Sequence, residues 1–217
     1  MKERMKKESI LWIYLISLIL LVISFIYDKK IVDFIASNRV DIFSSLFVYL
    51  GYITEWPILF FITLLILYYK KKDLLKRFVF VYSLTLIIIL ILRLLTKMSR
   101  PDSSFIEIDF LAFRYSFPSG HATTIFLLLP LFISIYPKYK KIFVLFAFLM
   151  AFSRLYIGVH YLSDIIFGIL LGYSLSYLFF VNIKRVNNKG ENIEKDIEKD
   201  IEKNNSKMSN KRRRYRK

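Results

Sequence analysis

The sequence predicts an all-α fold: a polytopic membrane protein with six transmembrane helices. The chain is 56% hydrophobic and has a positive mean hydropathy, although it carries 33 Lys and Arg. Its apolar residues lie in long runs that are separated by short basic connectors, whereas a soluble domain interleaves the two kinds of residue. Charged residues stand at the ends of three of these runs. Because ionisable groups at membrane edges are costly, these residues are candidates for a functional site.

The first two spans lie in the N-terminal third of the chain. The run Ile10 to Tyr27 follows a basic N-terminus. Only charged residues come after it, without a small-residue cleavage site, so it is interpreted as a retained transmembrane helix rather than a signal peptide. Residues 31 to 52 are mixed and predict an interfacial helix followed by a more apolar one. The second span is expected to begin before Trp56 and to bend near Gly51 and Pro57.

Four further spans follow. They are predicted at Phe78 to Leu95, from near Ser119 to before Pro137, at Ile142 to about Phe152, and at His160 to about Val181. Pro130 predicts a kink in the fourth span. The fifth is too short to cross unless it includes part of the next motif. Gly168 and Gly172 form a small-residue face on the sixth, where either a neighbouring helix or a second copy of the chain can approach closely.

The basic connectors predict the orientation in the membrane. The N-terminus, residues 70 to 77, residues 138 to 141 and the C-terminal tail all fall on one side if there are six spans. The positive-inside rule makes that side cytoplasmic. We therefore expect a multi-pass cell membrane protein with both termini in the cytoplasm. The motifs described below then meet on the extracytoplasmic face.

Two domains are expected: a six-helix membrane domain at 1–183 and a charged cytoplasmic tail at 184–217. The tail repeats IEKD, IEKD and IEKN, has few apolar residues, and predicts a disordered or marginally helical segment. Its last residues, Lys211 to Lys217, either touch anionic lipid or form a solvated charged end.

The net charge of +16 at first suggests nucleic acid, but the basic residues cluster beside apolar runs and in the tail. That distribution favours the lipid bilayer as the partner and argues against nucleic acid. The chain has no cysteine, so disulfides and thiolate metal sites are excluded. No feature of the pattern selects an oligomeric state.

Three arginines are expected at the extracytoplasmic face: Arg93, Arg100 and Arg154. Guanidinium groups match the geometry of phosphate oxygens. Ser119 and Gly120 lie where the fourth span begins, and the free N–H groups of a helix start attract anions. The ligand that this combination predicts is a phosphate group at the membrane surface.

The chain has only two histidines, His121 and His160, and both lie at the ends of apolar runs. If the sixth helix begins at or just before His160, His160 and Asp164 share a face. The carboxylate can then hold one ring nitrogen protonated and leave the other as a nucleophile. His121 would protonate the leaving oxygen and later activate water. This face has too few carboxylates for a magnesium or two-metal site, so neither metal nor cofactor is expected.

Each element also has an ordinary structural interpretation. PSGH at Pro118 to His121 can be a turn with a helix cap, Arg154 can reach the interface with its long side chain, and the His–Asp pair can be structural. The placement of all of them on one face favours the functional interpretation.

The motifs resemble those of the type 2 phosphatidic acid phosphatase (PAP2) superfamily. The third motif of the family is complete here as Ser153-Arg154, five residues, His160, three residues and Asp164. The second is the PSGH sequence. The first is Arg93, six residues, then Arg100-Pro101, with Arg93 where the family usually has Lys. The resemblance covers Arg93 to about Gly172 and implies a PAP2-like helical bundle.

The resemblance implies a metal-independent lipid phosphatase with a phosphohistidine intermediate. It assigns His160 as nucleophile, Asp164 as its partner and His121 as acid. Arg93, Arg100, Ser119, Gly120 and Arg154 become phosphate ligands, and Lys97 is an auxiliary candidate beside Arg93.

Several functions remain open within and beyond the family. The outward-facing site predicts an undecaprenyl diphosphate phosphatase. Phosphatidylglycerophosphate or phosphatidic acid phosphatase and lipid phosphotransferase are the enzymatic alternatives. A membrane protein that binds lipid phosphate without turnover is the non-enzymatic one, and the intact histidines argue against it. A transporter is disfavoured because the sequence shows no inverted repeats.

Overall fold

The computed structural model describes residues 2–106 and 114–182, and these residues are almost entirely helical. The elements are α1 (Lys2–Ser37), α2 (Asp41–Ile53), α3 (Trp56–Lys70), η1 (Lys72–Leu74), α4 (Leu75–Thr96), α5 (Gly120–Ile135), η3 (Pro137–Tyr139), α6 (Lys140–Tyr156), α7 (Leu162–Ser176) and η4 (Tyr177–Asn182). The all-α prediction is confirmed. The chain divides into two compact units, Met1–Tyr177 and Leu178–Lys217. The repeat-containing tail expected at 184–217 lies outside the described residues.

The number of membrane spans differs from the expected six. Within the described residues, two helical segments are long and apolar enough to cross a bilayer, Lys72–Thr96 and Leu162–Phe180. The pair α2 and α3, bent by 52° where they meet, is a third candidate if it counts as one span. The bend lies between Gly51 and Pro57, as predicted. Helix α5 has 16 residues, about 24 Å at the standard rise, which is shorter than the hydrocarbon core of a typical bilayer. Six spans are therefore not established.

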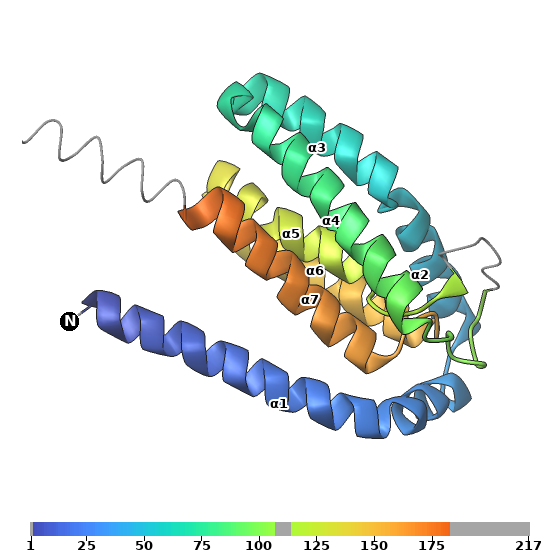
Figure 1. The fold of residues 1–217 in the computed structure, drawn as a ribbon. Coiled ribbons are helices and arrows are strands. Elements are labelled where there is room, and N and C mark those ends of the chain that lie inside the picture. Colours follow the sequence, from blue (N-terminus) through green and yellow to red (C-terminus); the bar gives the residue numbers. More distant parts are fainter. Residues whose placement is uncertain (1, 107–113, 183–217) are drawn as a thin grey trace, which may run out of the picture. The chain divides into compact units, whose positions relative to one another are not determined.

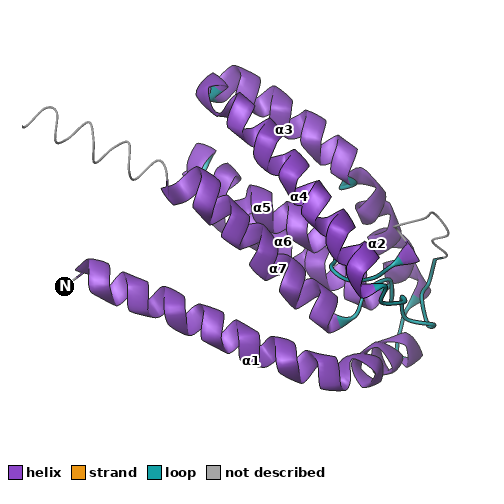
Figure 2. Cartoon of the chain, in the orientation of Figure 1, coloured by secondary structure: helices purple, strands orange, loops and turns teal. Residues whose placement is uncertain are grey.

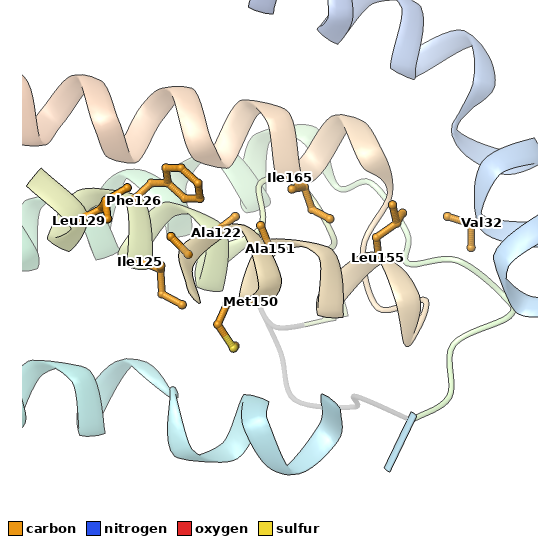
Figure 3. Close-up of a cluster of buried hydrophobic side chains, with 10 residues drawn as sticks. Val32, Ala122, Ile125, Phe126, Leu129, Met150, Ala151, Leu155 and Ile165 are labelled. Atoms are coloured by element: carbon orange, nitrogen blue, oxygen red, sulfur yellow. The ribbon is translucent and has the colours of Figure 1, made fainter. Parts of the chain in front are cut away.

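Helix α5 is the centre of the first unit, and it packs against both α6 and α7. Figure 3 shows the apolar side chains of this core, with Ile125 and Phe126 from α5, Met150 from α6 and Ile165 from α7. Nearly every residue of α5 from Ala122 to Leu131 is buried, so this helix has no polar face. That explains why its sequence from Ile125 to Ile133 is continuously apolar.

Glycines let α7 approach α5 closely. A Cβ atom added to Gly172 would lie 2.1 Å from the carbonyl oxygen of Thr123, and one added to Gly168 would lie 2.9 Å from that of Ser119. Both contacts are with backbone, so no side-chain movement could relieve them. Of the two uses considered for this small-residue face, the structure shows packing within the chain.

Polar contacts attach α1 to α7. Asp28 of α1 accepts hydrogen bonds from the backbone N–H of Ser163 at 3.0 Å and from its hydroxyl group. Further along, the hydroxyls of Tyr14 and Ser174 lie 2.8 Å apart. Asp28 thus occupies the N-terminal end of α7, where a carboxylate interacts favourably with free N–H groups and with the helix dipole.

The connections between α4 and α5 and between α6 and α7 lie at the same end of the first unit, as Figure 2 shows. The C-terminal ends of α4 and α6 and the N-terminal ends of α5 and α7 meet there (Figure 1). One backbone bond closes the connection between α4 and α5 on itself, and another joins it to the loop after α6. Ser116 N–H donates to Met98, and Phe105 N–H donates to Ile157, both at 2.8 Å. This end carries all three sequence motifs.

Candidate active site

The His160–Asp164 pair forms, but not on one face of a helix as expected. Helix α7 begins at Leu162, so His160 precedes it. Asp164 turns back over the helix start, where its Oδ2 accepts the Tyr161 N–H at 2.8 Å and lies 3.3 Å from Nδ1 of His160. The carboxylate therefore caps the helix and orients the imidazole with the same oxygen. Both side chains are buried, at 3% and 0% exposure.

Arg100 lies at the other nitrogen of the His160 ring. Its Nη1 is 3.5 Å from His160 Nε2 and also donates to the carbonyl oxygen of Val159. A phosphate that approached Nε2 would therefore meet this guanidinium. Burial and the neighbouring Arg93 lower the pKa of Arg100 to about 10, so it remains a cation at neutral pH.

Arg93 reaches the start of α5. Its Nη2 donates to the carbonyl oxygen of Pro118 at 3.4 Å, and a Cβ atom on Gly120 would lie 3.3 Å from the same nitrogen. Ser119 caps α5 by accepting the N–H of Ala122 at 3.5 Å. Gly120 thus leaves room for a guanidinium beside the free N–H groups of a helix start, which is an arrangement suited to an anion.

Arg154 lies in the last turn of α6 and is buried against α2. Its Nε donates to the Ser153 hydroxyl at 3.1 Å, and its Nη2 donates to the carbonyl oxygen of Phe47. A Cβ atom on Gly51 would lie 2.2 Å from its Nη1. Gly51 is therefore a site residue that the sequence interpretation did not identify. Its only signal in the sequence was its place beside a predicted bend.

His121 also faces α2. Its Nε2 lies 3.3 Å from the carbonyl oxygen of Gly51 and 3.7 Å from Oε1 of Glu55. Glu55 is the second residue that sequence reasoning missed. It stands between two apolar runs. Arg93, Arg154 and Asp164 were identified because they are charged residues at the ends of such runs, and the same criterion could have identified Glu55.

The auxiliary candidate Lys97 is exposed at the C-cap of α4, in the left-handed backbone region with φ 49°. Glu107 and Asp109, two acidic residues of the sequence between α4 and α5, lie outside the described residues.

The electrostatic environment favours a neutral His160. Burial and the charge of Arg100 hold the pKa of this imidazole well below its usual range. A neutral ring with Nδ1 directed at a carboxylate presents the lone pair of Nε2, the form needed for nucleophilic attack. The site therefore combines one oriented imidazole, a second imidazole and three buried or half-buried guanidinium groups.

Known proteins resemble this chain in sequence and in fold. The family model of the PAP2 superfamily matches residues 74–188, which is more than half of the chain. In sequence, the chain is similar to two lipid A 1-phosphatases. It is 38% identical to that of Rhizobium johnstonii over 63 residues, and 39% identical to that of Rhizobium etli over 57 residues. These segments cover 29% and 26% of this chain, but only 26% and 25% of the relatives.

Two crystal structures resemble the fold. One is a transmembrane PAP2-type phosphatidylglycerolphosphate phosphatase from Bacillus subtilis, with a TM-score of 0.63 and 21% identity. The similarity covers 82% of this chain and 96% of that one. The other is LpxE from Aquifex aeolicus, with a TM-score of 0.58 and 25% identity, covering 70% and 93% respectively.

Proposed function

Because this chain belongs to the PAP2 superfamily, we propose that it is a membrane lipid phosphatase that works through a phosphohistidine intermediate without a metal ion. The observation that carries the proposal is the pair of contacts on His160. Asp164 holds Nδ1, while Arg100 stands beside Nε2, where a phosphate would have to bind. A nucleophile and a phosphate ligand thus occupy adjacent positions in a buried site.

The reaction has two balanced steps. In the first, Nε2 of His160 attacks phosphorus, the bond from phosphorus to the lipid oxygen breaks, and His121 gives that oxygen a proton. In the second, His121 takes a proton from water, whose oxygen attacks phosphorus and breaks the P–N bond. Inorganic phosphate leaves and His160 is regenerated. Arg93, Arg100 and Arg154 stabilise the charge on the equatorial oxygens in both steps.

The substrate class that we propose first is a polyprenyl diphosphate of the undecaprenyl type. The support is the proposed outward orientation, in which a lipid of the outer leaflet reaches the site sideways. The sequence between α4 and α5 is too short to form a separate domain that binds a sugar head group, and it includes several aromatic residues, which favour contact with hydrocarbon.

A lipid phosphomonoester is the second candidate. The resemblance to lipid A 1-phosphatases and to a phosphatidylglycerolphosphate phosphatase favours it. So does Glu55, because its carboxylate beside His121 would repel a leaving group that itself carries a phosphate charge.

A substrate panel tests the proposal. The purified protein should release inorganic phosphate from at least one lipid phosphate in the presence of EDTA, and vanadate should inhibit the release. His160→Ala and His121→Ala should each lose nearly all turnover while inserting normally in the membrane. Activity that disappears with EDTA and returns with magnesium would contradict the metal-free mechanism. Substrate binding without any turnover would support the non-enzymatic alternative.

The same panel separates the substrate classes. The values of kcat/KM for a polyprenyl diphosphate, lipid A, phosphatidylglycerophosphate and phosphatidic acid are compared in one detergent. A preference for a phosphomonoester of more than about tenfold, roughly 1.4 kcal/mol in transition-state binding, would replace the first candidate by the second. Transfer of phosphate to an added alcohol would instead indicate a phosphotransferase.

A further inference from the structure

The joint between α2 and α3 reaches into the candidate active site. Gly51 and Glu55, on either side of the bend, both face the second imidazole, that of His121. A carbonyl oxygen can only accept a hydrogen bond, so the nitrogen 3.3 Å from the Gly51 oxygen is assigned as the protonated one. The imidazolium form of His121, which is the acid in the proposed reaction, therefore carries a proton on the nitrogen that faces both Gly51 and Glu55, and a second proton on Nδ1.

Burial of the His121 ring and the other charged groups around it both oppose a positive charge on this ring. Arg154 from α6, Arg93 from α4 and Arg100 from the loop after α4 all act on it through their charges. His160, from the loop before α7, interacts electrostatically with it too. An imidazolium beside three guanidinium groups is unfavourable unless a carboxylate offsets them.

Glu55 is the carboxylate that faces this ring. Its Oε1 lies 3.7 Å from Nε2 of His121, and its charge also attracts Arg154 and Arg93. Its side chain is 42% exposed, whereas that of Asp164 is fully buried and accepts the Tyr161 N–H. Each histidine of the site thus has its own acidic partner.

Building on the proposed phosphatase function, we propose that Glu55 is a positioning residue for His121, which holds the Nε2 proton in place and keeps the ring able to protonate the leaving oxygen. The proton moves from Nε2 of His121 to the lipid oxygen as the bond from phosphorus to oxygen breaks. Glu55 remains ionised throughout and stabilises the protonated ring before transfer. The α2–α3 joint becomes part of the active site, although none of the three sequence motifs includes it.

The first test measures the proton on His121 without turnover. The chain has only two histidines, so the ring signals of His121 can be assigned by NMR with the His160→Ala variant. The titration midpoint of His121 should fall by about one pH unit in Glu55→Gln. Glu55→Asp should recover part of the difference. Asp102→Asn is the matched control, because it removes an exposed carboxylate from the loop after α4. An unchanged midpoint in Glu55→Gln would overturn the inference.

The second test uses leaving groups that differ in their need for a proton. An alkyl phosphate requires protonation of its leaving oxygen, whereas p-nitrophenyl phosphate does not. Glu55→Gln should lower kcat/KM on a short-chain alkyl phosphate by about tenfold or more and leave kcat/KM on p-nitrophenyl phosphate within about threefold. This ratio reports the first step, in which the leaving groups differ, and not the hydrolysis of the phosphohistidine that both substrates share. The alkaline limb of kcat/KM should move to lower pH, while the acid limb should stay in place.

These outcomes separate this inference from the proposed function. Equal losses on both substrates, with unchanged pH limits, would show that Glu55 has only a structural role and overturn the inference. The phosphatase proposal would still stand, because the wild-type protein remains active in that case. A wild-type protein inactive on every lipid phosphate would overturn the proposed function, and the NMR titration alone would then decide whether Glu55 controls the His121 proton.

Discussion

His160 is the residue on which the proposed chemistry depends most directly, and its surroundings predict how activity varies with pH. It lies in the loop before α7, where burial and Arg100 hold its pKa well below the usual value near 6.5. A lowered pKa means that the neutral, nucleophilic form persists to lower pH. The acid limb of kcat/KM should therefore lie below pH 6.5, measured with a substrate whose phosphate ionisation has been determined separately. An acid limb above 6.5 would contradict this environment.

Gly51 makes room for Arg154, so a methyl group there should displace the guanidinium. Gly51→Ala would place Cβ 2.2 Å from Nη1, and Arg154 would have to move away. We expect kcat/KM to fall by about tenfold or more, approaching the loss in Arg154→Ala, with little change in expression. Ser45→Ala on the exposed side of α2 is the control. Full activity in Gly51→Ala would show that catalysis does not depend on the position of the Arg154 guanidinium.

Substitutions of Arg93 test whether a positive charge alone is enough for the proposed phosphate binding by the first motif. Its Nη2 contacts Pro118 and lies beside Gly120. Arg93→Lys keeps the positive charge and should retain substantial activity, whereas Arg93→Ala should lose most of it. Initial rates of phosphate release are compared at saturating substrate. A wild-type rate in Arg93→Ala would show that Lys97 or the other arginines, rather than Arg93, bind the phosphate.

At the scale of elements, the contact between α5 and α7 positions the second and third motifs relative to each other. Gly172 packs on backbone atoms, with Thr123 O 2.1 Å and Leu127 N 2.9 Å from an added Cβ. Gly172→Ala should therefore push the helices apart and destabilise the protein by about 1–3 kcal/mol. Thermal unfolding in detergent should show a lower Tm, whereas Tyr173→Phe on an exposed position should leave it unchanged. An unaltered Tm in Gly172→Ala would indicate that the two helices are not tightly packed.

At the scale of the whole molecule, the charge distribution predicts the orientation in the membrane. The chain has no cysteine, so single cysteines can be labelled cleanly. Asp102, after α4, and Lys72, before it, are both exposed. Asp102→Cys should react with an impermeant reagent in intact cells, and Lys72→Cys should react only after permeabilisation. The reverse pattern would place the site on the cytoplasmic face.

Much of the molecule could be predicted from the sequence because the relevant signals are local. Long apolar runs predict helices in any context, and a bend was expected where Gly51 and Pro57 interrupt one of them. The motif residues were recognisable by their spacing, since His160 and Asp164 are only four positions apart. Helix ends were less accurate, because the start of α7 at Leu162 depends on the cap that Asp164 provides.

The sequence by itself determined the all-α character, the charged ends of the apolar runs and the residues proposed to hold phosphate. Only the tertiary structure decided which partners those residues have. Glu55 meets His121, and Gly51 meets Arg154, across helices that are far apart in the chain. Neither contact could be predicted from the spacing of residues in the sequence, because that spacing does not show which faces of distant helices pack together. The packing of α2 against α6 and of α3 against α5 brings them together. The α2–α3 joint could therefore be identified as part of the site only after the helices were placed.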